Sequence, residues 1–292
     1  MPRAAAKTPT SAHSAAALKR LRGSRAFVFD MDGTLVLGDK TNHGLNPLPG
    51  ALEITNLLSE RAVPFVLFTN GTARTPQQYV GMLRDVGFRL KDDGVMTPAS
   101  SAADHFRRRG YSRILTLGGE GLEKPLRDAG MEIVTPEGKP NVDAVLVGWF
   151  REFTMSALEA ACHAAWNGAK VYSCSQSLYF ATAQGKALGT SRAISAMIED
   201  LTGARIHVIG KPSLEALRCA ARQLGVRTNE LAVVGDDPSL EVPMAHRGGA
   251  LAVAVHTGVG TTDSFGHLPK KQRPHLTVHD AGELLSLYKG HR

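Results

Sequence analysis

The sequence predicts an α/β fold in which an open, largely parallel sheet carries a second α/β unit inserted into it. Two observations lead to this prediction. Short apolar runs that suit buried strands alternate along the chain with segments in which apolar residues recur at helical spacing. Several of these runs end in acidic, hydroxyl-bearing or glycine-rich turns, and open α/β sheets place their active sites at the carboxyl ends of their strands.

The length and charge of the chain limit the classes of function. The 292 residues are enough for one or two domains, and no apolar stretch is long enough to span a membrane, so we expect no membrane partner. The net charge of +7 arises mostly at the N-terminus, because residues 1–25 hold six Lys or Arg and no acid. Taking these six from the total of 34 leaves 28 basic against 27 acidic residues. The body of the protein is therefore near neutral, and we expect no nucleic-acid partner.

The N-terminus and the cysteines bear on the location of the protein. Residues 1–24 are rich in Ala, Ser and basic residues and lack the apolar core of a secretory signal. We expect a disordered basic tail there, with an organelle transit peptide as the alternative. Cys162, Cys174 and Cys219 form no CxxC pair and no metal-ligand spacing. They suit reduced thiols, so we expect a cytoplasmic protein.

The first candidate site follows the apolar run 26–29, which ends in Asp30 and continues through Asp32, Gly33 and Thr34. Gly33 allows a sharp turn, so both carboxylates are expected at the carboxyl end of a strand. Two acids this close repel each other and need a cation, a shared proton or a substrate that uses both. Mg²⁺ with a phosphate ester fits, because Mg²⁺ binds one or two carboxylates together with phosphate oxygens. The alternatives are a plain turn or a calcium loop, but the further acidic ligands of a calcium loop do not follow here.

The second candidate site follows a strand predicted at 64–68. That run ends at Thr69, Asn70 and Gly71 and leads into a helix predicted over 76–89. A hydroxyl and backbone N–H groups at a strand end suit a cradle for phosphate. The simpler interpretation is a strand–turn–helix junction in which Thr69 caps the helix.

The middle of the chain predicts a separate α/β unit of about 90 residues, which is enough for a compact domain. We assign residues 98–188 to this inserted domain and residues 25–97 and 189–292 to the domain that carries it. A helix predicted over 187–201 is expected to return the chain to the carrier. The inserted unit has strands predicted at 113–117, 131–134, 144–147 and 170–174, and helices at 120–129 and 154–167.

Two later turns complete the candidate site. The strand predicted at 206–209 is followed by Lys211, whose ammonium would lie above the strand ends, although a solvated surface lysine is the alternative. The next predicted strand is followed by Asp236, Asp237 and, further on, Glu241. Acidic residues directly after an apolar strand favour a functional role over a purely structural one, although Asp237 also suits a solvated loop.

These four turns, in this order, resemble the four motifs of the haloacid dehalogenase-like (HAD) superfamily. The inserted unit lies between the second and third motifs, where the subclass IIA proteins carry a large α/β cap. The segments Pro49-Gly50-Ala51, Thr97-Pro98-Ala99-Ser100-Ser101 and Val147-Gly148-Trp149 further resemble the NagD-type phosphatases. The resemblance covers residues 26–261 and implies a doubly wound parallel-sheet core with an inserted α/β cap domain.

The resemblance also implies a role for each candidate residue. Asp30 would be the nucleophile, Asp32 the general acid and base, and Lys211 a cation that neutralises charge on Asp30 and the phosphoryl group. Mg²⁺ would bind Asp30, the backbone carbonyl of Asp32, and Asp236. The remaining residues would bind the phosphoryl oxygens or support the site: Thr69, Asn70 and Gly71 in the first role, Glu241 and Asp237 in the second.

Three departures from the NagD pattern bear on the substrate. Glu241 stands where this branch usually has Asp, and Phe150 stands where its cap commonly has Asp. Residues 175–177, Ser-Gln-Ser, replace an Asn-Pro-Asp-like turn. The first departure concerns metal geometry, and the other two put a familiar substrate of the branch in doubt.

The function implied is that of an Mg²⁺-dependent phosphatase that hydrolyses a small phosphomonoester through an aspartyl-phosphate intermediate. Sugar phosphates, glycerol phosphate, phosphoglycolate, pyridoxal phosphate and nucleotides all remain open as the small phosphorylated metabolite, because fold-level analogy does not choose among them. The alternatives are a phosphotransferase or phosphomutase, and a catalytically degenerate module that binds a metabolite. A homodimer is possible, since oligomerisation through the cap is common among proteins of this kind.

Overall fold

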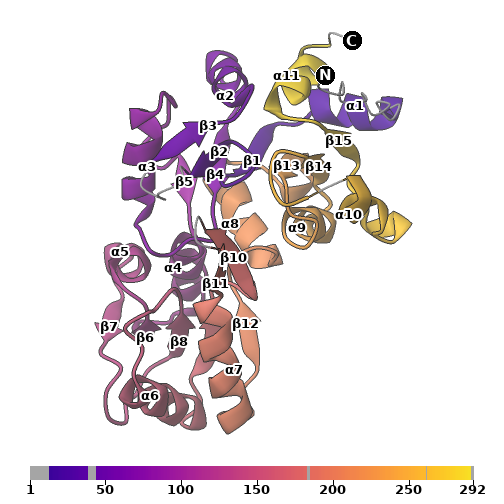
Figure 1. The fold of residues 1–292 in the computed structure, drawn as a ribbon. Helices are drawn as coiled ribbons and strands as arrows, with labels where there is room; N and C mark the ends of the chain where they lie inside the picture. Colours follow the sequence, from indigo (N-terminus) through magenta and orange to yellow (C-terminus); the bar gives the residue numbers. More distant parts are fainter. Residues whose placement is uncertain (1–12, 39–43, 183–184, 261, 291–292) are drawn as a thin grey trace.

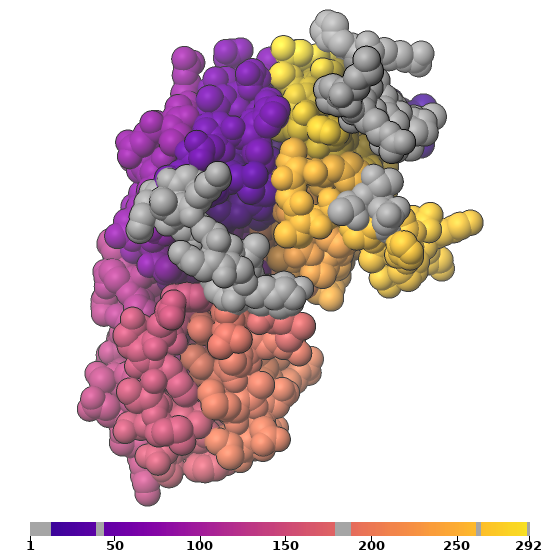
Figure 2. Space-filling view, viewed as in Figure 1, coloured from indigo at the N-terminus to yellow at the C-terminus, as the bar shows by residue number. Residues whose placement is uncertain are grey.

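The protein has two lobes in its computed structural model, which describes residues 13–38, 44–182, 185–260 and 262–290. The first and last parts of the chain build one lobe, and the middle part builds the other (Figures 1 and 2). The fold is α/β, with one parallel sheet at the centre of each lobe, so the predicted fold class is confirmed. In the described ranges no helix is long and apolar enough to cross a membrane.

The core lobe is built on a six-stranded sheet in the order β15-β14-β13-β1-β4-β5. All of its pairings are parallel, and β1 lies between β13 and β4, with Phe29 paired to Val234 and Asp30 paired to Phe68. Because neighbouring parallel strands end at the same edge, the turns after β1, β4 and β13 meet there. The strand bounds are Ala26–Asp30 (β1), Phe65–Phe68 (β4), Val95–Met96 (β5), Leu231–Gly235 (β13), Leu251–Val255 (β14) and Leu276–Val278 (β15).

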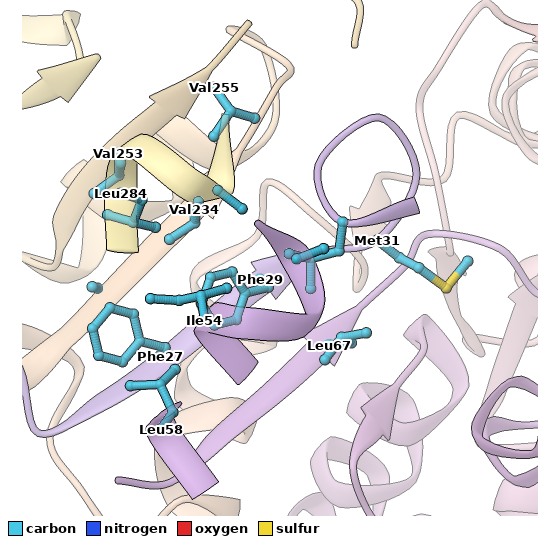
Figure 3. Close-up of a cluster of buried hydrophobic side chains, with 14 of the residues drawn as sticks. Phe27, Phe29, Met31, Ile54, Leu58, Leu67, Val234, Val253, Val255 and Leu284 are labelled. Atoms are coloured by element: carbon cyan, nitrogen blue, oxygen red, sulfur yellow. The ribbon is translucent and has the colours of Figure 1, made fainter. Parts of the chain in front are cut away.

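Helices cover both faces of this sheet, because successive side chains of a buried strand point to opposite sides. Phe27 and Phe29 pack on one face with Ile54, Leu58 and Leu284 (Figure 3). That face is covered by α1 (Ala15–Arg22), α2 (Ala51–Glu60), α3 (Pro76–Asp85) and α11 (Ala281–Lys289). The other face is covered by α8 (Leu214–Gln223), α9 (Glu241–Gly248) and α10 (Thr262–Gly266).

Helix α1 corrects the prediction that residues 1–24 form a disordered tail. Residues 15–22 are helical, with the Ser14 side chain accepting from the Ala17 N–H, and α1 packs beside α11. Ala17 and Leu21 are buried, and their i, i+4 spacing places both on the face that meets the core. The basic composition concealed this short apolar stripe. The prediction for residues 1–12 lies outside the described residues.

The second lobe is built on a five-stranded parallel sheet in the order β12-β9-β8-β6-β7. Helices α6 and α7 cover one face, and α4 and α5 cover the other. A two-stranded hairpin, β10–β11, stands apart from this sheet. The bounds are Pro98–Arg109 (α4), Arg113–Leu117 (β6), Glu120–Asp128 (α5), Glu132–Val134 (β7), Ala144–Val147 (β8), Met155–Trp166 (α6), Lys170–Ser173 (β9), Tyr179–Thr182 (β10), Gly185–Leu188 (β11), Thr190–Thr202 (α7) and Ile206–Val208 (β12).

The boundary predicted at 188/189 differs from the structure. Helix α7 was expected to return to the core, yet Ile194 and Ile198 pack in the hydrophobic cluster of the second lobe. Strand β12 pairs with β9 at the edge of the same sheet. Helical periodicity shows that a helix has a buried face but not which sheet that face covers, so the sequence could not settle the assignment.

Helices α4 and α8 pack against each other and join the lobes. The Arg222 guanidinium pairs with the Asp104 carboxylate, and the Cys219 thiol lies 3.9 Å from the Ser100 carbonyl oxygen. The core lobe also carries an antiparallel pair, β2 (Val36–Gly38) with β3 (Leu45–Pro47). Two short 3₁₀ helices, Thr228–Glu230 and Lys270–Gln272, complete the described elements.

Candidate active site

Asp30 is the last residue of β1 and is only 7% exposed. Its two carboxylate oxygens have different partners: the Lys211 ammonium binds Oδ1, and the Thr34 hydroxyl donates to Oδ2 at 3.0 Å. Both partners hold the carboxylate in one orientation. A buried carboxylate held in one orientation beside a cation is suited to attack an anionic electrophile, because the cation offsets the repulsion between the two negative charges.

Lys211 lies between two carboxylates although it is 2% exposed. Besides Asp30, its ammonium contacts Glu241 Oε1 at 2.7 Å, and Glu241 Oε2 accepts from the Asp237 N–H at 3.1 Å. Burial alone would lower the pKa of Lys211, but the charges of Asp30 and Glu241 outweigh it and raise that pKa. Lys211 therefore stays protonated inside the protein, as a fixed positive charge at the strand ends.

Glu241 is 2% exposed at the start of α9. Its side chain lies against Gly235, where a Cβ would stand 2.1 Å from Glu241 Cγ. Burial raises the pKa of Glu241 to about 8, with the Asp30 charge acting in the same direction and Lys211 against it. These contacts make Glu241 a support for Lys211.

Asp32 differs from Asp30 in its surroundings. The residue is exposed to solvent, although protein atoms surround its carboxyl on most sides. Burial among these atoms, followed by the Asp30 charge, raises the pKa of Asp32 to about 6. The Thr69 hydroxyl lies 3.4 Å from Asp32 Oδ2. A carboxyl with a pKa near neutrality and access to solvent can give and take a proton.

Asp236 follows β13 and is 4% exposed. Its Oδ2 accepts from the Val259 N–H at 2.6 Å and lies against two glycines. A Cβ would stand 2.7 Å from this oxygen at Gly33 and 1.9 Å from it at Gly258, so the carboxylate fits only because both residues lack side chains. Burial, followed by the Asp30 charge, raises the pKa of Asp236 to about 7.

The oxygen atoms of this edge suit a divalent cation. The Asp30 charge raises the pKa of Asp236, and hard oxygen ligands of this kind suit Mg²⁺. In the described part of the chain, no three His, Cys, Asp or Glu side chains are arranged as a metal-binding cluster. The expected ligand set contains only two carboxylates, with the Asp32 backbone carbonyl as the third ligand, so the residues present fit the ion.

The loop after β4 contacts the other candidate residues. The Thr69 hydroxyl accepts from the Gly71 N–H at 3.0 Å, which folds the loop back on itself. The side-chain amide of Asn70 bonds to the backbone of Lys211. The Thr72 hydroxyl accepts from the Trp149 N–H of the second lobe at 2.8 Å. The structure therefore brings Thr69, Asn70 and Gly71 to the edge that carries Asp30.

Asp237 lies in the same turn but has a local role. Its Oδ1 accepts from both the backbone N–H and the hydroxyl of Ser239, at 2.7 and 2.6 Å. These bonds stabilise the loop before α9, as the solvated-loop interpretation expected. Asp237 reaches the site through its backbone N–H on Glu241 and not through its carboxylate.

Four contacts of the site escaped sequence reasoning. Thr34 and the Val259 N–H bind the two buried carboxylates, as described above. The Tyr79 hydroxyl would lie 2.4 Å from a Cβ at Gly71, and Arg74 hydrogen-bonds to Tyr79. Burial, followed by the Asp32 charge, raises the pKa of Tyr79 to about 12. Of these residues, only Thr34 had a sequence signal that could have identified it, because it stands next to Gly33 in the first motif.

The two departures in the second lobe have structural explanations. Phe150 packs against Phe153 beside the cluster of α6 and α7, so its side chain serves the interior of the lobe. In the 175–177 turn, the Ser175 hydroxyl donates to the Ser177 hydroxyl at 3.2 Å and accepts from the Ser177 N–H. Hydroxyls thus close this turn in place of the Asn-Pro-Asp-like sequence.

Comparison with known proteins gives matches along most of the chain. Residues 27–132 match the model of a haloacid dehalogenase-like hydrolase family, and residues 208–284 match that of a HAD-hydrolase-like family. The acid sugar phosphatase of Staphylococcus epidermidis is 29% identical over 242 residues, covering 82% of this chain and 90% of that protein.

Three solved structures share the two-lobed fold. The 4-nitrophenylphosphatase of Thermotoga maritima matches with a TM-score of 0.81 at 29% identity, covering 92% of this chain and 99% of its own. NagD from Escherichia coli matches with a TM-score of 0.78 at 25% identity, covering 89% of this chain and 97% of its own. The glycerol phosphate phosphatase of Mycobacterium tuberculosis, in complex with calcium, matches with a TM-score of 0.79 at 25% identity. The match covers 91% of this chain and 76% of that protein's chain.

Proposed function

Because the chain belongs to the haloacid dehalogenase-like hydrolases and is a phosphoric monoester hydrolase of the NagD type, we propose that it hydrolyses a small, soluble phosphomonoester through an aspartyl-phosphate on Asp30, with Mg²⁺ as its cation. The observation that carries the proposal is the position of Lys211. This buried cation contacts Asp30 and Glu241 at once, at the edge where Asp32, Thr69 and Asp236 also lie.

Two steps follow from the different surroundings of the two carboxylates. In the first, an Asp30 oxygen bonds to phosphorus while the bond from phosphorus to the ester oxygen breaks, and Asp32 gives its proton to the departing oxygen. In the second, Asp32 takes a proton from water, whose oxygen attacks phosphorus and releases phosphate from Asp30. The pKa of Asp32, raised to about 6, supports its use in both directions near neutral pH.

Charge compensation is the task of the surrounding groups. Lys211, the Thr69 hydroxyl and the Asn70 N–H would bind the phosphoryl oxygens as negative charge develops on them, while the Gly71 N–H holds the Thr69 hydroxyl in place. Asp30, the Asp32 carbonyl and Asp236 would hold Mg²⁺, which when bound screens the repulsion between the phosphate and the attacking carboxylate. The calcium in the mycobacterial relative supports a divalent cation.

The second lobe supports a small substrate. Its Trp149 backbone is bonded to Thr72, close to the phosphate loop, so it restricts the room on that side of the site. The relatives are named for sugar phosphate, glycerol phosphate and nitrophenyl phosphate. We propose a substrate from the same range of small esters, with phosphoglycolate and nucleotides as further members of the test panel.

A phosphate-release screen tests the proposal. The wild type is compared with Asp30→Asn over a panel of small phosphate esters, each with Mg²⁺ and with EDTA. We expect turnover that needs Mg²⁺ and falls by at least 10³-fold in the variant, because the nucleophile is lost. A folded wild type that turns over no ester refutes the proposal, and turnover that survives in Asp30→Asn refutes the role of Asp30.

A further inference from the structure

We propose that the Asn70 side chain is a positioning residue: its amide holds the backbone of Lys211, and thereby places the Lys211 ammonium between Asp30 and Glu241. The inference rests on the proposed function for the role of Lys211. It gives the Asn70 side chain a task separate from that of its backbone N–H, which would bind the phosphoryl group.

The amide of Asn70 makes two hydrogen bonds to one residue. Its Nδ2 donates to the Lys211 carbonyl at 3.1 Å, and its Oδ1 accepts from the Lys211 N–H at 2.9 Å. Only one orientation of the amide gives both bonds, since a flipped amide would face donor to donor and acceptor to acceptor. This two-point pairing fixes both the position and the direction of the Lys211 backbone.

The residue before Lys211 is shaped for this pairing. A Cβ at Gly210 would stand 2.7 Å from Asn70 Oδ1 and 2.1 Å from the Cys174 carbonyl oxygen. A side chain at position 210 would therefore displace either the amide or the end of the second-lobe sheet. Gly210 lets the chain pass between these two groups, so the approach of Asn70 to Lys211 depends on it.

Lys211 needs an anchor because of where its backbone comes from. Strand β12 belongs to the sheet of the second lobe and ends at Val208, three residues before Lys211, whereas α8 of the core begins only at Leu214. The carboxylates that bind its ammonium belong to the core, on β1 and at the start of α9. Asn70 follows β4 of the core, so its amide ties the Lys211 backbone to the same lobe as those carboxylates.

A double-mutant cycle tests this assignment on an aryl phosphate with Mg²⁺. Asn70→Ala keeps the backbone N–H, so we expect kcat to fall about 10–100-fold while KM changes less than about threefold, as expected for a misplaced catalytic group. In a Lys211→Ala background the same change should lower kcat by less than about threefold. An equal loss in both backgrounds, or no loss in the wild-type background, overturns the proposal.

Asn70→Asp provides a graded second variant. It retains an acceptor for the Lys211 N–H but replaces the donor to the Lys211 carbonyl by an acceptor. Its kcat should lie at or below that of Asn70→Ala, since two acceptors that face each other repel. A kcat equal to that of the wild type would overturn the proposal. Melting temperatures measured beside the kinetics identify any variant that fails to fold.

Chemical labelling gives a readout that does not depend on activity. Lys211 is 2% exposed, so an amine-acylating reagent should leave it unlabelled in the wild type and label it in Asn70→Ala, as detected by peptide mass spectrometry. The matched control is Thr72→Ala, which alters the same loop at its bond to Trp149 and should leave Lys211 protected. Equal protection of Lys211 in Asn70→Ala contradicts the inference. A wild type without turnover contradicts the proposed function, while the labelling still decides the position of Lys211.

Discussion

Asp236 should make the protein less stable as the pH rises, and Mg²⁺ should reverse this loss. Its pKa is raised from 3.8 to about 7, so the folded state binds the Asp236 proton more tightly than the unfolded chain does. The stabilising contribution is therefore complete below about pH 4 and is lost as the pH rises through about 7. Asp236→Asn removes this titration, and its side-chain oxygen can still accept from the Val259 N–H.

The size of the effect follows from the shift. One pKa unit corresponds to about 1.4 kcal/mol, so a shift of about three units gives a change of up to about 4 kcal/mol across the window. In a domain of 150–250 residues, each kcal/mol moves the melting temperature by about 2–4 °C. About 3 kcal/mol of this change falls between about pH 4.5 and 7.5, so without metal the wild type should lose about 6–12 °C more than Asp236→Asn over that range.

Calorimetric melting at a series of pH values measures this difference. Asp32 and Glu241 titrate in both proteins, but the Asp236 charge also raises the pKa of Glu241, so the difference measures Asp236 together with its effect on Glu241. With EDTA the two melting curves should diverge as the pH rises. Added Mg²⁺ should then raise the melting temperature of the wild type at pH 7.5 and leave that of Asp236→Asn nearly unchanged, since a ligand stabilises only the state that binds it. Equal pH dependence in both proteins, or equal stabilisation by Mg²⁺, would refute the reasoning.

Two further predictions concern residues near Asp236. Gly258→Ala places a Cβ 1.9 Å from the Asp236 carboxylate and should lower kcat/KM at least 100-fold. The control is Gly81→Ala, which should leave kcat/KM unchanged because no atom lies within 4 Å of the added Cβ. Similar kinetics for the two variants would show that the Asp236 pocket is not needed. Asp237→Asn keeps the backbone N–H that binds Glu241 and should retain kcat within about threefold, so a loss above 30-fold in the same phosphate-release assay would instead place its carboxylate in the chemistry.

Local patterns predicted the sheet of the core well. The strands at Ala26–Asp30 and Leu231–Gly235 are apolar runs with clear polar ends, and such short buried runs alternating with helices favour a parallel sheet. Once β1, β4 and β13 are neighbours, Asp30, Thr69 and Asp236 must meet. The gathering of these residues therefore follows from strand order together with local sequence.

Long-range contacts were beyond the sequence. Nothing local shows that β12 pairs with β9 and not with a core strand, so the origin of Lys211 from the second lobe could not be predicted. The amide of Asn70 was similarly hidden, because its partner lies 141 residues away. The basic composition near Leu21 outweighed a stripe of only two buried residues.

The covalent step on Asp30 is tested most directly by trapping its product. Borohydride reduces an acyl phosphate to an alcohol, so treatment during turnover should convert Asp30 to homoserine, which peptide mass spectrometry detects. We predict this conversion at residue 30 when substrate and Mg²⁺ are both present, and no conversion when substrate is left out. In Asp32→Asn, a substrate whose leaving group needs a proton should also give no homoserine, since the acyl phosphate then does not form. Steady turnover with no homoserine at residue 30, or with homoserine at another acid, would contradict the mechanism.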